Sequence, residues 1–161
     1  LYMVEVGEKA PFFSEMKAGG ESDEFVLERK LDFGPVVLAF FPAAFSSPCE
    51  EEFDELKNLS KSLNRSQGHV VGVSADSPFC LEKFRGDKEV DFDLVSDMGG
   101  RVSSSYGVKV DIPELGLYGV PNRSVFVLDA GGNVIFKWKA ENPAQQPDMD
   151  RVRKEVKSLS R

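Results

Sequence analysis

The pattern of apolar positions predicts a strand followed by a helix in the first half of the chain. Residues 35–41, PVVLAFF, form a continuous apolar run that ends at Pro42, which is typical of a central strand buried on both faces. After the loop AAFSS, apolar residues recur at three- and four-residue steps from Phe53 to Leu63. This spacing predicts an amphipathic helix that ends near the turn RSQG at residues 65–68.

Further along the chain, the same two patterns predict short strands and helices down to the C-terminus. In order, they are a strand at 69–75, a helix at 78–84 that stops around Gly86, a strand at 92–95, a short helix at 102–106, strands at 124–128 and 134–138, and a helix that begins near Asp148. The turn DAGGN joins the last two strands into a hairpin at the edge of the sheet. This order predicts an α/β protein with a thioredoxin-like fold, in which helices flank a central mixed β-sheet.

Length and charge limit the size and the partners of this fold. A chain of 161 residues, of which 41% are hydrophobic, can bury one full core. We expect the native start at Met3 and a single domain over residues 3–161. The net charge of −7 and the absence of a Lys- and Arg-rich run argue against a nucleic-acid or membrane partner. The sequence shows neither a leader-peptide pattern nor a membrane-spanning apolar run, so we expect a soluble, cytoplasmic protein.

The two cysteines, Cys49 and Cys80, are too few for a disulfide scaffold and lack the accompanying ligands of a metal site. In this class of fold, reactive groups lie where strands end and helices begin. The segment FFPAAFSSPCEEE, which contains Cys49, has this position.

Cys49 has two interpretations. It could be the first apolar residue of the buried helix face that continues with Phe53, with Ser47 as the N-cap and Pro48 in the first helical position. Alternatively, a thiol in the first turn of a helix faces unpaired backbone N–H groups and the positive end of the helix dipole, which favour a reactive thiolate. The acidic residues at 50–52 oppose this effect, so a nearby cation is required.

Arg123 is the best candidate for that cation. It opens a buried apolar strand after the turn GVPN, from where its guanidinium could reach across the end of the sheet to the sulfur. The other interpretation is an ordinary arginine at a strand end, paired with a surface acid.

A family resemblance adds weight to the chemical interpretation. The spacing Pro42-x-x-x-Ser46-x-x-Cys49 resembles the P-x-x-x-T/S-x-x-C signature of the peroxiredoxins, and it follows a strand and opens a helix as it does in them. Arg123 in PNRSVFVLD resembles the arginine that begins a late strand in this family. The segments FFPAAF, SADSPF, FDLVSD, SSSYGV and ENPAQQPD look most like the group of alkyl hydroperoxide reductase E and the bacterioferritin-comigratory-protein relatives.

The resemblance implies a thiol-dependent peroxidase in which Cys49 is the peroxidatic nucleophile. Pro42 would roof the pocket, and Ser46, in place of the more usual threonine, would direct its hydroxyl to the thiolate and the peroxide. The backbone N–H of Cys49 and one from residues 43–44 would bind peroxide oxygens, while Arg123 stabilises the moving charge. Attack on hydrogen peroxide or an organic hydroperoxide would leave a sulfenic acid and release water or an alcohol.

Two further residues are supporting candidates. Glu52 matches a position that is often acidic in the family and takes part in polar contacts around the pocket, although a solvated acid in a first helical turn would have the same pattern. Phe45 resembles an aromatic residue that lines the pocket or a subunit interface. A loop aromatic folded onto its own core would look the same.

Cys80 also has two interpretations. It is either a small buried residue on the face that continues with Phe84, or a resolving cysteine that forms a disulfide with Cys49. In relatives with a resolving cysteine in this helix, the aligned position lies about one turn later, near Arg85, so a helix start would have to unwind before the sulfurs meet. Otherwise an external thiol, from a thioredoxin- or glutaredoxin-like protein or a small molecule, completes the cycle.

The resemblance further implies a homodimer formed through the loops around the pocket, and it implies no metal, haem or flavin cofactor because the thiolate carries the chemistry. A competing interpretation keeps the fold without a reactive thiol, as a binding or chaperone-like protein. A disulfide reductase of the same fold would need a C-x-x-C pair, and Ser46 stands where its first cysteine would be.

Overall fold

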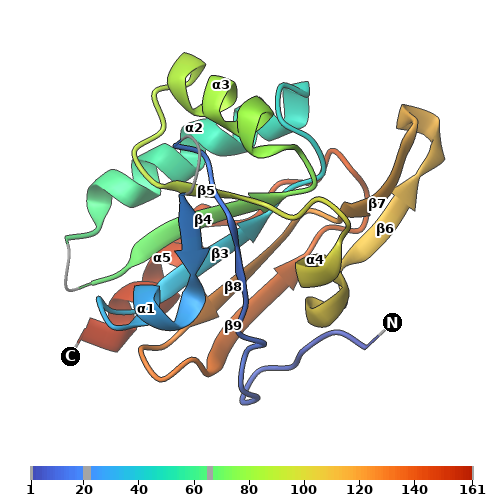
Figure 1. The fold of residues 1–161 in the computed structure, drawn as a ribbon. Coiled ribbons are helices and arrows are strands. Elements are labelled where there is room, and N and C mark those ends of the chain that lie inside the picture. Colours follow the sequence, from blue (N-terminus) through green and yellow to red (C-terminus); the bar gives the residue numbers. More distant parts are fainter. Residues whose placement is uncertain (1, 20–22, 65–66, 161) are drawn as a thin grey trace.

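A five-stranded mixed sheet forms the centre of the protein, in a computed structural model that describes residues 2–19, 23–64 and 67–160 (Figure 1). The strands lie in the spatial order β5 (Asp93–Ser96), β4 (His69–Ser74), β3 (Val36–Phe40), β8 (Ser124–Leu128) and β9 (Val134–Lys139). β3 pairs in parallel with β4 and antiparallel with β8. The predicted central strand is therefore central, and the predicted hairpin β8–β9 lies at the edge.

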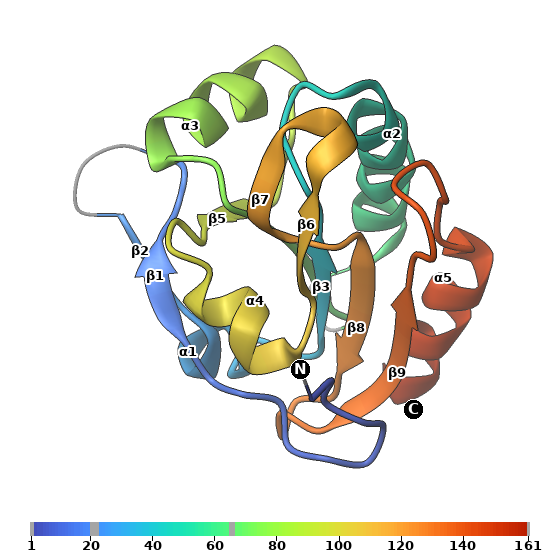
Figure 2. The ribbon, with the colours of Figure 1, turned by 90° about the vertical axis from the view of Figure 1, so that its right-hand side faces the viewer.

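The two faces of the sheet carry separate apolar cores because successive residues of β3 point to opposite sides. Val37 and Ala39 pack on the face covered by α2 (Ser47–Ser62), α3 (Pro78–Asp87) and α5 (Met149–Lys157). Leu38 and Phe40 pack on the other face, with α1 (Leu27–Leu31) and α4 (Arg101–Tyr106), which lies in front of the sheet in Figure 2. The mixed sheet with helices on both faces confirms the predicted fold class.

Two small hairpins were not predicted from the sequence. One joins β1 (Ser14–Met16) to β2 (Glu24–Val26), and the other joins β6 (Lys109–Ile112) to β7 (Leu117–Pro121) through a 3-10 turn at Pro113–Leu115. A second 3-10 turn, Ser158–Ser160, follows α5. These strands have three to five residues, too few to establish a periodic pattern of apolar and polar positions in the sequence.

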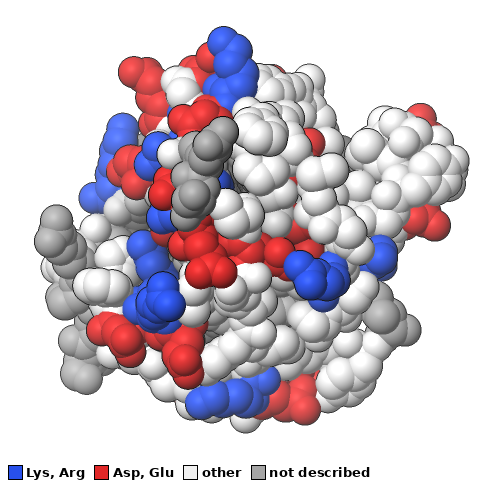
Figure 3. Space-filling view, in the orientation of Figure 1, with Lys and Arg blue, Asp and Glu red and all other residues white. Residues whose placement is uncertain are grey.

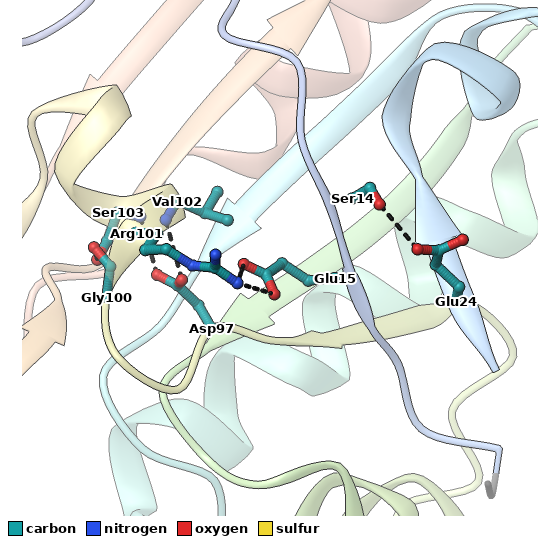
Figure 4. A network of polar contacts seen from close by, with 8 residues as sticks. All are labelled: Ser14, Glu15, Glu24, Asp97, Gly100, Arg101, Val102 and Ser103. Atoms are coloured by element: carbon teal, nitrogen blue, oxygen red, sulfur yellow. Dashed lines mark hydrogen bonds and ion pairs between the residues drawn. The ribbon is translucent and has the colours of Figure 1, made fainter. Parts of the chain in front are cut away.

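A polar network outside the main sheet fixes α4 in place (Figure 4). The carboxylate of Asp97 accepts the backbone N–H groups of Val102 at 2.9 Å and Ser103 at 2.8 Å, and so caps the helix. Arg101 donates to both carboxylate oxygens of Glu15, at 3.0 Å each, which ties the same helix to β1. The network explains how a helix of six residues keeps its place.

The boundaries of the longer helices agree closely with the sequence pattern. α2 ends at Ser62, ahead of the predicted turn RSQG, whose first two residues lie outside the described part of the chain. α3 continues through Gly86 to Asp87, three residues beyond the predicted end, and α5 begins after Asp148 as predicted. Because α2 buries the side chains of Phe53, Leu56 and Leu59 on the sheet, each contributes about 1.5–3 kcal/mol to the stability of this helix.

The surface mixes charges of both signs. Figure 3 shows Lys and Arg side chains scattered among Asp and Glu on one face, consistent with a chain of 20 basic and 27 acidic residues. Within residues 2–19, 23–64 and 67–160, none of the helices has the length and apolar character needed to cross a membrane.

Candidate active site

The candidate site lies where β3 ends and α2 begins. Phe41 and Pro42 follow the strand and are buried, and residues 43–46 form a loop that leads into the helix. Cys49 is the third residue of α2, and its side chain is fully buried in the apolar core below the loop. Both expectations for Cys49 are therefore met in part, because the thiol belongs to the buried helix face and also lies in the first turn.

The guanidinium of Arg123 reaches the sulfur of Cys49. Its Nη2 donates a hydrogen bond of 3.3 Å to Sγ, across a sequence separation of 74 residues. The pairing of β3 with β8 explains the contact. Phe40, the last residue of β3, lies opposite Ser124, the first residue of β8, so the antiparallel register brings Arg123 next to the C-terminal end of β3. Arg123 is therefore not the surface-paired arginine of the alternative interpretation; only 1% of the residue is exposed.

Glu52 is the acid that pairs with Arg123. Its Oε1 accepts from Nη1 of the guanidinium, and both side chains are buried. Its other oxygen, Oε2, is buried and has no hydrogen-bond partner among the described residues. Glu52 is thus part of the polar site, and the alternative of a solvated acid is wrong.

Burial governs the titration of this pair. It raises the pKa of Glu52 from its usual 4.5 to about 7, which the charge and hydrogen bond of Arg123 offset only in part. For Arg123, burial acts to lower the pKa, but the negative charges of Glu52 and Cys49 outweigh that effect and raise it. The guanidinium therefore stays positive beside the sulfur, whereas the Glu52 carboxyl titrates close to neutral pH.

The loop between β9 and α5 contributes two contacts that the sequence did not predict. The backbone carbonyl of Pro143 accepts from Nη2 of Arg123 at 3.1 Å, and Nε2 of Gln146 donates to the carbonyl of Pro48 at 3.0 Å. Both residues belong to the segment ENPAQQPD, which carries part of the family resemblance but has no reactive side chain. This loop therefore holds both the arginine and the start of α2.

The start of α2 differs from the prediction by one residue. The N-cap is Ser46 and not Ser47, so Pro48 is the second helical residue. The hydroxyl of Ser46 donates to the carbonyl of Ala43 at 2.9 Å and makes no capping hydrogen bond. Its proton is thus engaged within the loop, while its oxygen remains an acceptor.

The backbone N–H of Ala44, one of the two amides predicted to bind a peroxide oxygen, donates to another residue of the protein. The N–H of Ala44 donates to Oδ2 of Asp76 at 2.8 Å, so of the two residues the N–H of Ala43 stays the predicted donor to a peroxide oxygen. The reason is tertiary, because Asp76 follows the neighbouring parallel strand β4 and meets the loop at the same sheet edge. A polar residue directly after a strand end was the sequence signal for Asp76.

Phe45 lies in the loop at 43–46, and Cys80 lies in α3. The ring of Phe45 packs edge-on against Phe84 of α3, with centroids 5.0 Å apart, and 44% of the residue remains exposed. Phe45 therefore packs on its own core and still offers an exposed edge. Cys80 is the third residue of α3 and is partly exposed. Burial, followed by the charge and hydrogen bond of Asp76, raises the pKa of its thiol.

Both cysteines are free in the structure. Cys49 is fully buried in the first turn of α2, so its sulfur must become more accessible before it can bond to Cys80 or to the thiol of another protein. The unwinding of a helix start and the choice between the two thiols stay predictions.

Comparison with known proteins gives a consistent result. Residues 6–137 match the AhpC/TSA family. A protein of Mycobacterium tuberculosis named as a peroxiredoxin is 34% identical over 105 residues, which cover 65% of this chain and 67% of that protein. The chloroplastic peroxiredoxin Q of Oryza sativa is 29% identical over 134 residues, covering 83% of this chain and 58% of that protein.

A solved structure shares the fold over almost its full length. The crystal structure of the peroxidoxin BcpB from Mycobacterium tuberculosis superposes with a TM-score of 0.80 and 28% identity, covering 99% of this chain and 97% of that one.

Proposed function

The chain belongs to the AhpC/TSA family, the peroxiredoxins, and is a thiol-dependent peroxidase; on that premise we propose that Cys49 is the thiol that attacks the peroxide. The hydrogen bond from the buried Arg123 guanidinium to the Cys49 sulfur is the observation that supports this assignment most directly. A permanent positive charge at the sulfur favours the thiolate, which is the nucleophilic form. The family assignment also favours an enzyme over the binding or chaperone-like role that the sequence left open.

The reaction is a nucleophilic displacement at oxygen. The Cys49 thiolate forms a bond to one peroxide oxygen while the O–O bond breaks, and the departing oxygen takes a proton to leave as water or an alcohol. The sulfur is oxidised to a sulfenic acid and the peroxide is reduced. Negative charge moves from the sulfur to the leaving oxygen, both within reach of the fixed guanidinium of Arg123.

The residues around the sulfur have distinct roles in this proposal. Pro42, which is buried just after β3, is proposed to cover the sulfur and limit the access of water, which strengthens the electrostatic contacts inside. The free acceptor capacity of the Ser46 oxygen suits the O–H of the peroxide. The backbone N–H of Cys49 lies in the first turn of α2, where amides lack helical acceptors and can donate to a peroxide oxygen. Glu52 orients Arg123.

A thiol reduces the sulfenic acid in the second half of the cycle. We propose an external thiol, from a thioredoxin- or glutaredoxin-like protein or a small molecule, as the reductant, because the position that aligns with the resolving cysteine of relatives lies about one turn beyond Cys80, near Arg85. A disulfide between Cys49 and Cys80 is the alternative. A homodimer, with the exposed edge of Phe45 and the exposed Phe79 at its contact, is also proposed. A cytoplasmic location stays a prediction.

Peroxide consumption in the presence of dithiothreitol tests the proposal. The wild-type protein and Cys80→Ser should consume hydrogen peroxide at similar rates, whereas Cys49→Ser should not consume it. Mass spectrometry after one equivalent of peroxide then separates the two recycling routes. Sulfenic or sulfinic acid on Cys49 with free Cys80 supports the external thiol, and a linked Cys49–Cys80 peptide supports the internal one. Peroxide turnover by Cys49→Ser would overturn the assignment.

A further inference from the structure

Asp76 connects the end of β4 to the loop that precedes Cys49. Its Oδ2 accepts the N–H of Ala44 at 2.8 Å and the hydroxyl of Ser74 at 2.7 Å. The loop and Asp76 are 32 residues apart in the sequence and meet because β3 and β4 are parallel neighbours that end at the same edge. The carboxylate is thus a tertiary anchor for a loop of four residues.

The anchor itself is held by two strands. The backbone N–H of Asp76 donates to the hydroxyl of Ser74 at 3.2 Å, and its carbonyl accepts from the hydroxyl of Ser96, at the end of β5, at 2.7 Å. Asp76 therefore has little freedom to follow the loop. A displacement of the loop must break the hydrogen bond to Ala44 and leave a partly buried charge with fewer donors.

The residues next to Ala44 depend on this hydrogen bond. Phe45 has a φ of +69°, a left-handed conformation that a residue with a side chain adopts only when its surroundings hold it there. Ser46 closes the loop by donating to the carbonyl of Ala43. Fixing the Ala44 N–H therefore fixes Pro42 and Ser46 relative to the sulfur.

We propose that Asp76 is a positioning residue of the peroxidase reaction, which acts through the Ala44 amide on the loop above Cys49. This inference rests on the proposed role of Cys49. Asp76 does not touch the reacting atoms, and its effect on the rate comes from the geometry that it gives to Pro42 and Ser46. A misplacement of about 1 Å in such groups can lower a rate by about 100-fold.

Three substitutions separate positioning from a merely structural role. Asp76→Ala removes the acceptor for Ala44, and the second-order rate of Cys49 oxidation by hydrogen peroxide should fall about 10- to 100-fold in folded protein. Asp76→Asn keeps an oxygen acceptor for the amide, so the rate should stay within about threefold of the wild type. Asp129→Ala is the matched control, because it also removes a carboxylate that accepts a backbone N–H, that of Asn133 at 2.9 Å, but in the turn at the end of β8 opposite Arg123, and its rate should equal that of the wild type.

The rate of Cys49 oxidation is measured by competition with a second peroxide-consuming reaction, and circular dichroism shows whether each variant folds. Cys49→Ser is the reference that lacks the reactive thiol. A folded Asp76→Ala protein with the wild-type rate would overturn the positioning role, as would an equal loss of rate in Asp129→Ala. Peroxide turnover by the reference would instead overturn the role of Cys49 itself. Should Asp76→Ala not fold, hydrogen exchange in the wild type decides, because the proposal requires a protected Ala44 amide and an unprotected one contradicts it.

Discussion

Arg123 donates a hydrogen bond of 3.3 Å to the sulfur of Cys49, while another nitrogen of the same guanidinium holds the buried carboxyl of Glu52. One positive charge therefore serves both the reactive sulfur and a buried acid. Any change at Arg123 acts on the rate and on the stability together, and these two effects have to be separated by experiment.

Arg123→Ala should lower the rate of peroxide reduction about 100-fold or more, because the charge beside the sulfur is lost. It should also cost about 3–5 kcal/mol of stability, since Glu52 remains buried without its partner. The double variant Arg123→Ala with Glu52→Gln should recover most of this stability and none of the rate. Urea unfolding and peroxide kinetics measure the two effects.

A surface arginine provides the control for this comparison. Arg151 pairs with Glu155 one turn away and is largely exposed, so Arg151→Ala should change stability by less than about 0.5 kcal/mol and leave the rate unaltered. Recovery of the rate in the double variant at Arg123 and Glu52 would show that the guanidinium is not needed for the chemistry.

Glu52 should make stability depend on pH. Between about pH 4.5 and pH 7 the unfolded chain releases the Glu52 proton, whereas the folded protein keeps it because the pKa of Glu52 is raised to about 7. Its contribution to stability is therefore complete below about pH 4.5 and lost as the pH rises to about 7. The stability of the wild type relative to Glu52→Gln should fall by about 3 kcal/mol over this window.

Urea unfolding at the two ends of the window tests this sign. Glu55→Gln, an exposed change on the same helix, is the control and should show no comparable dependence. A wild type that gains stability relative to Glu52→Gln as the pH rises would mean that the attraction of Arg123 outweighs burial.

Ser46→Ala should slow the reaction with little loss of stability. The Ser46 side chain makes no capping hydrogen bond, so the cost should lie below the roughly 1 kcal/mol of an ordinary N-cap. Its bond to the carbonyl of Ala43 is lost, and the loop above the sulfur loosens. Ser46→Thr keeps the hydroxyl and restricts its rotamers, so it should match or exceed the wild-type rate. If Ser46→Ala lost about 1 kcal/mol of stability, as for an ordinary N-cap, and kept the wild-type rate, this role would be contradicted.

Two glycines should respond in opposite ways to substitution by alanine. A Cβ on Gly72 of β4 would lie 2.8 Å from Cδ2 of Leu94 and 3.4 Å from the ring of Phe53, beneath α2. Gly72→Ala should therefore cost about 1–3 kcal/mol. Gly86 lies in α3 with open space at the Cβ position, so Gly86→Ala should stabilise the protein by about 0.5–1 kcal/mol. Thermal unfolding of the two variants measures both effects as changes in Tm. A change of the same sign in both Tm values would contradict this prediction.

The local elements of the site follow from the sequence. The apolar run before Pro42 defines β3, and the helical spacing from Phe53 onwards defines α2, so the position of Cys49 in a first helical turn is determined by neighbours in the chain. Only the precise start of α2 was misjudged, because Ser46 and Ser47 are equally suited to an N-cap and the loop contact of Ser46 decides between them.

The surroundings of the sulfur were decided by the tertiary structure. The sequence alone left Arg123 and Glu52 as ordinary surface residues or as site residues, and it did not reveal the contacts of Asp76, Pro143 and Gln146. Their positions depend on the order and register of strands: β8 lies antiparallel and β4 parallel to β3, so residues far apart in the chain meet at one sheet edge. Local propensity and the spacing of apolar residues determine whether each segment forms a helix or a strand. Contacts between distant segments arise only when the sheet is assembled.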